Sequence, residues 1–168
     1  MIRLTKETDY GIVLLSHFAS EGVGSTYSAR ALAAETQIPL PMVSKILKVL
    51  ARQGWLVSQR GAKGGYTLAQ QPDAISVAEI IKGIEGPIAI TECVEAPGDC
   101  RQESVCRTRH HWKMINRTVR RALETITLSD MATPMPDRLV ALDPAPTRFD
   151  YRSPSEEDRA PSHFLLDG

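Results

Sequence analysis

Three cysteines in one short segment are the side chains of this 168-residue sequence whose type and spacing best suit metal or redox chemistry. Cys93, Cys100 and Cys106 follow a C-x6-C-x5-C pattern among polar residues, whereas a cysteine with only a packing role is usually buried. The pattern lacks the close C-x2-4-C pair of most zinc sites and differs from ferredoxin spacings. The spacing therefore leaves three interpretations open: an iron–sulfur cluster, redox-active thiols or a zinc site.

The surroundings and the odd number of these cysteines indicate a reducing compartment. Arg101, Arg107 and Arg109 favour the thiolate form and offset the charge of a cluster. Three cysteines do not make a closed disulfide framework, and the first apolar patch, 11–19, is not followed by a signal-peptide cleavage site. The sequence has no run of 18 apolar residues, so we expect a cytoplasmic protein without a membrane-spanning helix.

The charge distribution favours a nucleic-acid partner, although the formal net charge is zero. Residues 1–71 hold eight Lys and Arg against four acidic residues, a balance of +4. Residues 133–168 hold four Arg against seven acidic residues, a balance of −3, and six of the eleven prolines. A basic first half beside an acidic tail is found in proteins that bind nucleic acids, although a solvated surface gives the same balance. The tail 133–168 cannot bury enough apolar surface to fold, so we expect it to be disordered.

The elements that must position these residues are mainly helical, as hydrophobic periodicity and capping signals indicate. The predicted helices are 6–20, 29–35, 41–53, 77–82 and 107–125, with a last turn at 128–131. Two β-type runs, 55–58 and 66–68, flank a glycine-rich segment that permits a tight hairpin. The cysteines lie in the remaining loop, 85–105, and at its end. We expect the third helix to bury four aliphatic residues: Val43, Ile46, Leu47 and Leu50.

The order helix, helix, turn, helix, hairpin is that of a winged helix-turn-helix, whose third helix enters the major groove of DNA. Ser44, Lys48 and Arg52 are spaced i, i+4, i+8 and share one stripe away from the apolar side. The hairpin, or wing, places Arg60 and Lys63 where they suit phosphates or a narrow minor groove. The predicted DNA-contacting residues are Ser28, Pro41, Ser44, Lys45, Lys48, Arg52, Arg60, Lys63 and Gly64.

Several short motifs accompany the cysteine loop in a fixed order. They are Thr8-Asp9-Tyr10-Gly11, Val43-Ser44-Lys45-Ile46-Leu47-Lys48, Arg60-Gly61-Ala62-Lys63-Gly64-Gly65-Tyr66 and Ile75-Ser76-Val77-Ala78-Glu79-Ile80. Together with the loop, these motifs resemble the winged-helix iron–sulfur transcription regulators typified by IscR and NsrR. Gly86-Pro87-Ile88-Ala89, Thr91-Glu92-Cys93 and Cys106 followed by Trp112 are most similar to the branch that regulates SUF-system iron–sulfur assembly. The resemblance covers residues 1–132 and leaves out the tail.

The resemblance implies a homodimeric regulator that binds pseudo-palindromic double-stranded operators and senses cluster status. It divides the chain into a DNA-binding domain (1–84), a cluster-binding loop (85–106), a dimerisation helix (107–132) and the tail (133–168). In the dimerisation helix the apolar side is Trp112, Ile115, Val119, Ala122 and Leu123. The three cysteines would hold a [2Fe-2S] cluster together with one ligand that is not a cysteine. We expect occupancy of this loop to change how it packs against the winged domain, and so to alter operator affinity.

The fourth ligand is where the sequence departs from the resemblance. IscR-type regulators carry a histidine three residues after the last cysteine, and here that place is Arg109, which cannot act as a ligand. His110 and His111 follow, and His110 shares a helical face with Cys106. NsrR-type regulators use an acidic residue near the amino terminus of the other subunit, and Asp9 matches that place. We favour Asp9 and keep His110 as the alternative.

Other functions are compatible with parts of the sequence. An enzyme is disfavoured because the sequence has no Walker, Rossmann or nucleophile-elbow motif, and a Cys106–His110 pair lacks a group to orient the histidine. A winged-helix regulator that uses redox-active thiols or zinc, without iron, is the main alternative. A DNA-binding protein with inert cysteines is a third possibility, which exchange of the cysteines would reveal.

Overall fold

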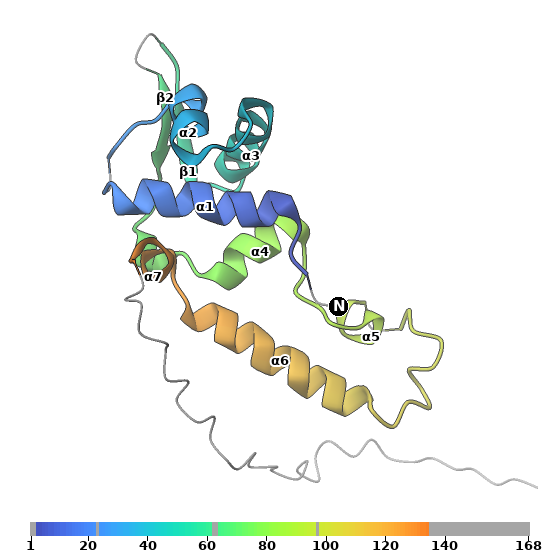
Figure 1. Ribbon diagram of the computed structural model, residues 1–168. Helices are drawn as coiled ribbons and strands as arrows, with labels where there is room; N and C mark the ends of the chain where they lie inside the picture. The colour runs from blue at the N-terminus through green and yellow to red at the C-terminus, as the bar shows by residue number, and fades with distance from the viewer. Residues whose placement is uncertain (1–2, 23, 62–63, 97, 135–168) are drawn as a thin grey trace, which may run out of the picture. The chain divides into compact units, whose positions relative to one another are not determined.

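A computed structural model describes residues 3–22, 24–61, 64–96 and 98–134 of the chain (Figure 1). The chain divides into two compact units, Met1–Pro134 and Met135–Gly168, and the second lies outside the described residues. The predicted disordered tail therefore falls, apart from its first two residues, outside them. The predicted DNA contact Lys63 lies outside them as well.

The described unit is mainly helical with one small antiparallel sheet, as predicted. Its elements are α1 (Lys6–Ser20), α2 (Ala29–Thr36), α3 (Leu40–Arg52), β1 (Leu56–Gln59), β2 (Gly65–Leu68), the 3-10 helix η1 (Pro72–Ala74), α4 (Val77–Glu85), α5 (Glu92–Glu95), α6 (Arg109–Thr125) and α7 (Leu128–Ala132). The two strands pair from Leu56 opposite Leu68 to Gln59 opposite Gly65.

Side-chain caps fix where the helices begin. Thr5 accepts a hydrogen bond from the Thr8 amide at the start of α1, and Ser28 accepts one from the first turn of α2. Ser76 and Glu79 form a capping box at the start of α4, each accepting from the backbone of the other. These caps satisfy amides that have no partner inside the helix and so fix the residue at which each helix begins.

One hydrophobic core joins the helices α1–α4 and the hairpin. In Figure 1, α1 lies between α2, α3 and the hairpin on one side and α4 and α7 on the other, and it packs against α3, α4 and α7. The predicted apolar side of α3 is confirmed, since its four aliphatic residues are at most 2% exposed. Full burial of one such side chain contributes about 1.5–3 kcal/mol, so α3 is firmly anchored from behind.

The structure corrects three predicted boundaries. Helix α4 was expected to end at Lys82, but it continues through Gly83 to Glu85. A Cβ at Gly83 would lie 2.5 Å from the Trp55 ring, so this glycine permits close packing and does not end the helix. The predicted loop contains one helical turn, α5, and α6 begins at Arg109 instead of residue 107.

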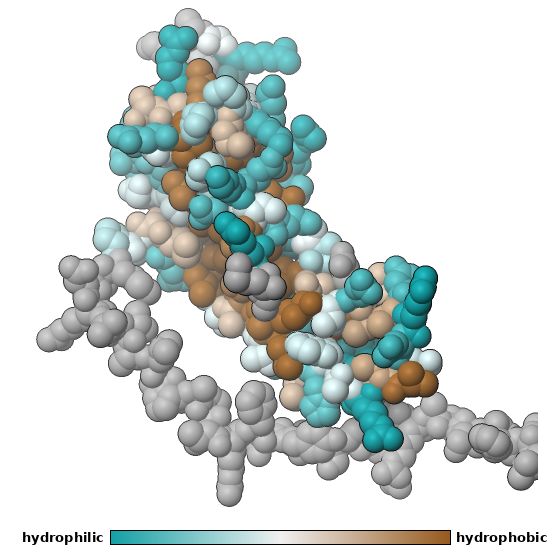
Figure 2. All heavy atoms as spheres, turned by 45° about the vertical axis from the view of Figure 1, so that its right-hand side comes forward, coloured by the Kyte–Doolittle hydropathy of each residue, from teal (hydrophilic) through white to brown (hydrophobic). Residues whose placement is uncertain are grey.

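Helix α6 leaves most of its apolar side uncovered in the single chain. Trp112 is 38% exposed and Ile115 is 41% exposed, and the residue that is buried is the polar Asn116. Figure 2 shows apolar surface open to solvent in the lower half of the molecule, where α6 lies, below a mostly hydrophilic upper half. An uncovered apolar surface of this kind is typical of a protein–protein interface. None of the described helices is both long enough and apolar enough to cross a bilayer.

Candidate nucleic-acid interface and cysteine loop

Helix α3 directs a positively charged side away from the core. Lys45, Lys48 and Arg52 are exposed, and Ser44 is half-buried beside them. Because the opposite side is fixed against α1 and α2, the charged side has a set direction and does not depend on a flexible terminus. This is the property that a helix needs to read the major groove.

The turn before α3 has the backbone that the helix-turn-helix requires. Gln37 ends α2 in the left-handed region, with φ 57°, and Ile38 is buried directly after it. Pro41 lies in the first turn of α3, where no intrahelical partner for its missing N–H is needed. The Ser28 hydroxyl oxygen accepts the Ala31 N–H at 3.1 Å and so caps α2. The hydroxyl hydrogen of Ser28 remains available to donate to a phosphate.

The wing is anchored to the helical half at its base. Tyr27 and Tyr66 exchange two backbone hydrogen bonds, at 3.0 and 2.9 Å. At the other end, a Cβ on Gly64 would lie 2.5 Å from the Gln59 carbonyl oxygen, so only glycine fits this turn. Arg60 is exposed at the end of β1. The described part of the wing therefore packs beside α3 and carries one exposed cation, Arg60.

Ion pairs distinguish the cations of α3 from one another. Lys45 is paired with Glu7 of α1. Among the described residues, Lys48 and Arg52 have no carboxylate within ion-pair distance. Lys48 and Arg52 are therefore free to contact phosphates, whereas Lys45 must first leave its partner.

The three cysteines are free thiols in three different settings. Cys93 is buried in α5 with its Sγ 3.3 Å from the Thr91 hydroxyl, and Cys100 is half-buried in the following loop. Cys106 is half-buried with its Sγ 3.3 Å from the Thr108 hydroxyl. The hydrogen bond to Thr108 lowers the pKa of the Cys106 thiol, and the charge of Arg109 adds to this.

The thiol chemistry suits an iron–sulfur cluster, but no metal site is assembled in the described residues of one chain. Within them, no three His, Cys, Asp or Glu side chains are gathered closely enough to hold a metal ion. Asp9 is exposed on α1, and His110 and His111 are exposed at the start of α6. Arg109, expected to favour a thiolate, pairs with Glu103. The assignment of Asp9 or His110 as the fourth ligand therefore stays a prediction.

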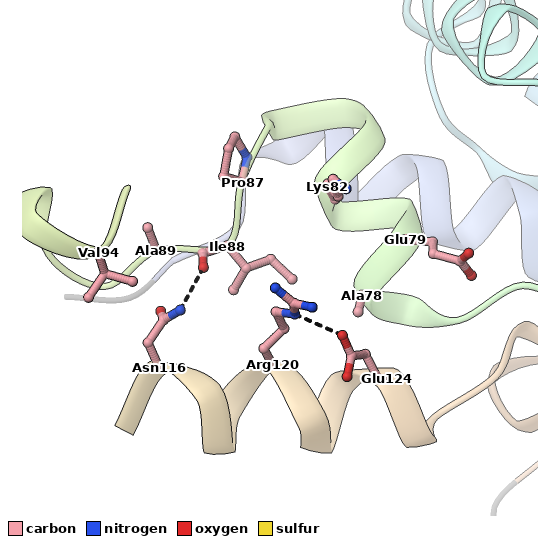
Figure 3. Close-up of a pocket in the computed structure, with 10 residues that line it drawn as sticks. All are labelled: Ala78, Glu79, Lys82, Pro87, Ile88, Ala89, Val94, Asn116, Arg120 and Glu124. Atoms are coloured by element: carbon pink, nitrogen blue, oxygen red, sulfur yellow. Dashed lines mark hydrogen bonds and ion pairs between the residues drawn. The ribbon is translucent and has the colours of Figure 1, made fainter. Parts of the chain in front are cut away.

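Asn116 holds the segment before Cys93 in place, a role that the sequence reasoning missed. Its amide oxygen accepts the Ile90 N–H at 3.1 Å. Its amide nitrogen donates to the Ile88 carbonyl at 3.0 Å, as Figure 3 shows. It thereby fixes the extended segment that leads to Cys93 against α6. The signal was in the sequence, since a polar residue four positions after Trp112 interrupts an otherwise apolar helical face.

Figure 3 shows the cavity that this anchor borders, between α4 and α6, with a volume of about 300 Å³. Its lining is mixed in charge, because Lys82 and Arg120 lie close to Glu79 and Glu124. Arg120 and Glu124 form an ion pair at 2.8 Å. The charges of the lining largely compensate each other, and they select no class of ligand.

Glu85 links the start of the cysteine loop to the start of α1. Its carboxylate accepts the Thr5 N–H at 2.6 Å. Partial burial raises the pKa of Glu85, but hydrogen bonds from Thr8 and Thr5 outweigh it, so this pKa lies below its ordinary value. The first turn of α1 is therefore held in place by the residue that begins the predicted cysteine loop.

Comparison with known proteins gives the same picture of a transcription regulator. Residues 4–134 match the family model Rrf2, described as an iron-dependent transcriptional regulator. The chain is 32% identical over 130 residues to Protein rrf2 of Nitratidesulfovibrio vulgaris, covering 77% of this chain and 87% of that protein.

Solved structures agree with the fold. CymR, the global cysteine regulator of Bacillus subtilis, superposes with a TM-score of 0.64 at 28% identity, covering 79% of this chain and 97% of that one. IscR of T. potens superposes with a TM-score of 0.59 at 25% identity, covering 77% and 85%. The predicted fold, mainly helical with a winged helix-turn-helix, is confirmed by these structures. From the match over residues 4–134, the chain belongs to the Rrf2 family of DNA-binding transcriptional regulators.

Proposed function

We propose that this Rrf2-family regulator is a cytoplasmic homodimer that binds an operator through α3 and the wing and senses iron–sulfur cluster status through Cys93, Cys100 and Cys106. The observation that carries the proposal is the placement of three free thiols between α4 and α6, in a loop joined by Glu85 to the first helix of the DNA-binding half. Genes of iron–sulfur assembly are the targets that the resemblance to the SUF branch implies.

The donor set fits such a group because iron–sulfur clusters are held by cysteine thiolates. Cys93, Cys100 and Cys106 would be three ligands, with Asp9 as the favoured fourth and His110 as the alternative. A bound cluster supplies redox and ligand-exchange chemistry at this loop. The residues of the chain do the rest: Asn116 fixes the segment before Cys93, and Glu85 ties the beginning of the loop to Thr5.

The dimer is supported by the uncovered apolar side of α6. Trp112 is 38% exposed and Ile115 is 41% exposed in one chain. A second copy packed there would bury this apolar surface, and each Å² removed from water would stabilise the dimer by about 25 cal/mol. Two DNA-reading helices would then face two half-sites of one operator.

The experiment that tests the proposal is anaerobic purification with iron and sulfide counts and ultraviolet–visible spectra. We expect iron and sulfide in the wild type, with their loss in Cys93→Ala, Cys100→Ala and Cys106→Ala. Asp9→Ala and His110→Ala identify the fourth ligand, with His111→Ala as the matched control. Operator affinity measured with and without the cluster should differ about 5–150-fold, the range of a coupling of about 1–3 kcal/mol. Colourless protein without iron that still regulates its target would contradict the cluster.

The second candidate is a regulator that uses the same thiols without iron. It is favoured by the Thr108 hydrogen bond, which lowers the pKa of the Cys106 thiol. Such a protein would change operator affinity on treatment with peroxide or on binding zinc, with no visible absorbance. Replacement of Cys106 alone would abolish that response.

A further inference from the structure

An ion pair joins α1 to α3, the proposed DNA-reading helix. The Glu7 carboxylate contacts the Lys45 ammonium group, and the two side chains are 36% and 61% exposed. An exposed pair of this kind adds little to the stability of a fold. Its main effect is therefore on Lys45, a predicted DNA contact, whose ammonium group it occupies.

Glu7 stands beside Lys45 because of how α1 packs on α3. Gly11 lies one turn after Glu7 on the same helical face, and a Cβ there would be 2.8 Å from Ile84 of α4, 3.8 Å from Ile46 and 3.9 Å from Leu50. The face of α1 that carries Glu7 is therefore turned to both α3 and α4. Core packing of α1 on these helices places the Glu7 backbone within reach of Lys45.

The turn that carries Glu7 is also held at its beginning. Thr5 caps α1 by accepting the Thr8 amide, and its own N–H is bound by Glu85. An N-terminal turn held on both sides does not fray, and the helix dipole favours a carboxylate in it. The negative charge of Glu7 is thus presented to Lys45 from a fixed position.

We propose that Glu7 is an intramolecular competitor of DNA phosphate for Lys45 and that it lowers the affinity of this regulator for any duplex. The inference rests on the proposed placement of α3 against DNA. A phosphate that contacts Lys45 must displace the carboxylate, which then remains close to the negatively charged backbone. Lys48 and Arg52, which have no acidic partner in the described part of the chain, carry no such penalty. Glu7 therefore makes Lys45 less available to phosphates and weakens the sequence-independent, electrostatic part of DNA binding.

The test compares Glu7→Gln with the wild type on a fluorescent 30-base-pair duplex of mixed sequence, by anisotropy at several salt concentrations. A surface pair is worth up to about 1 kcal/mol, which corresponds to about 2–5-fold tighter binding for each DNA-reading helix when the carboxylate is removed. We also expect a plot of log affinity against log salt to become steeper, by about 0.9 for each additional phosphate that the protein neutralises. Equal or weaker binding of Glu7→Gln would overturn the inference.

Three further variants separate the pairing from a general change of charge and from a wrong DNA-binding face. Glu124→Gln removes the same charge from the Arg120 pair on α6 and should leave affinity nearly unchanged. In a Lys45→Gln background, Glu7→Gln should have little effect, and the same gain there would show that Lys45 is not the target. If Lys48→Gln also leaves affinity unchanged, then the proposed DNA-binding face itself is wrong, and the inference falls with it. Urea denaturation confirms that each variant is folded.

Discussion

Replacing Asn116 is the most direct test of how the cysteine loop is held. The side chain is 7% exposed, and its amide makes both hydrogen bonds of the segment 88–90 to α6. Asn116→Ala would leave the Ile88 carbonyl and the Ile90 N–H without this partner. We expect a loss of stability together with a loosened loop, since no other described side chain bonds to these two groups.

The magnitude follows from the burial of the groups. A buried donor or acceptor left unsatisfied costs about 1–3 kcal/mol, and the low end applies because Ile88 and Ile90 are half-buried and water can reach them in part. Loss of both hydrogen bonds should therefore lower the free energy of unfolding by about 2 kcal/mol. With a urea m-value of about 2 kcal/mol per molar, the midpoint of unfolding should fall by about 1 M.

The assay is urea denaturation followed by circular dichroism at one fixed protein concentration, because a dimer contributes stability that depends on concentration. Thr118→Ala is the matched control, since its hydroxyl bonds only to the Met114 carbonyl of the same helix and is exposed. Hydrogen exchange of the Ile90 amide is a second measurement, and it should speed up in Asn116→Ala alone. A midpoint within about 0.2 M of wild type, with Ile90 still protected, would refute the reasoning.

Three further predictions concern the DNA-binding face, the wing and acid stability. Lys48→Gln should weaken binding to any duplex and lower the salt slope by about 0.9 for each phosphate that is no longer neutralised, whereas Lys113→Gln on α6 should change neither, as anisotropy titrations can show. Gly65→Ala should destabilise the protein by about 1–3 kcal/mol, because its Cβ would lie 2.5 Å from the Tyr27 carbonyl oxygen; an unchanged melting temperature would contradict this packing. The lowered pKa of Glu85 implies stabilisation that is complete above its unfolded-state pKa and is lost as pH falls through its folded-state pKa. The difference in urea midpoint between wild type and Glu85→Gln should therefore be constant at neutral pH and should shrink as pH falls below the ordinary glutamate pKa of about 4.3; a difference that stays constant in acid would argue against it.

The fold could be predicted from the sequence wherever local signals and the core agree. The caps Ser28 and Ser76 mark helix starts, and the apolar side of α3 has a clear helical period. The prediction failed at Gly83, because a glycine that ends a helix and one that lets a tryptophan approach look alike in the sequence. Local patterns cannot tell which distant side chain will contact a residue.

The candidate site was predictable in its residue types and not in its connections. The cysteines and the cations of α3 stand out by type and spacing. Glu7 and Asn116 do not, because their roles arise from partners 38 and 26–28 residues away in the chain. Such pairs depend on the packing of α1 on α3 and of the loop on α6, which only the folded chain shows.

The first turn of α1 brings the two halves of the proposed mechanism together. Thr5 is bound by Glu85 at the start of the cysteine loop, and Glu7 contacts Lys45 of the DNA-reading helix. Asp9, the favoured fourth ligand, lies two residues after Glu7 on the same helix. Thr5, Glu7 and Asp9 thus lie within two turns of one helix, so the proposed cysteine-loop sensor and the proposed DNA contact Lys45 both have a partner in the same short segment of α1.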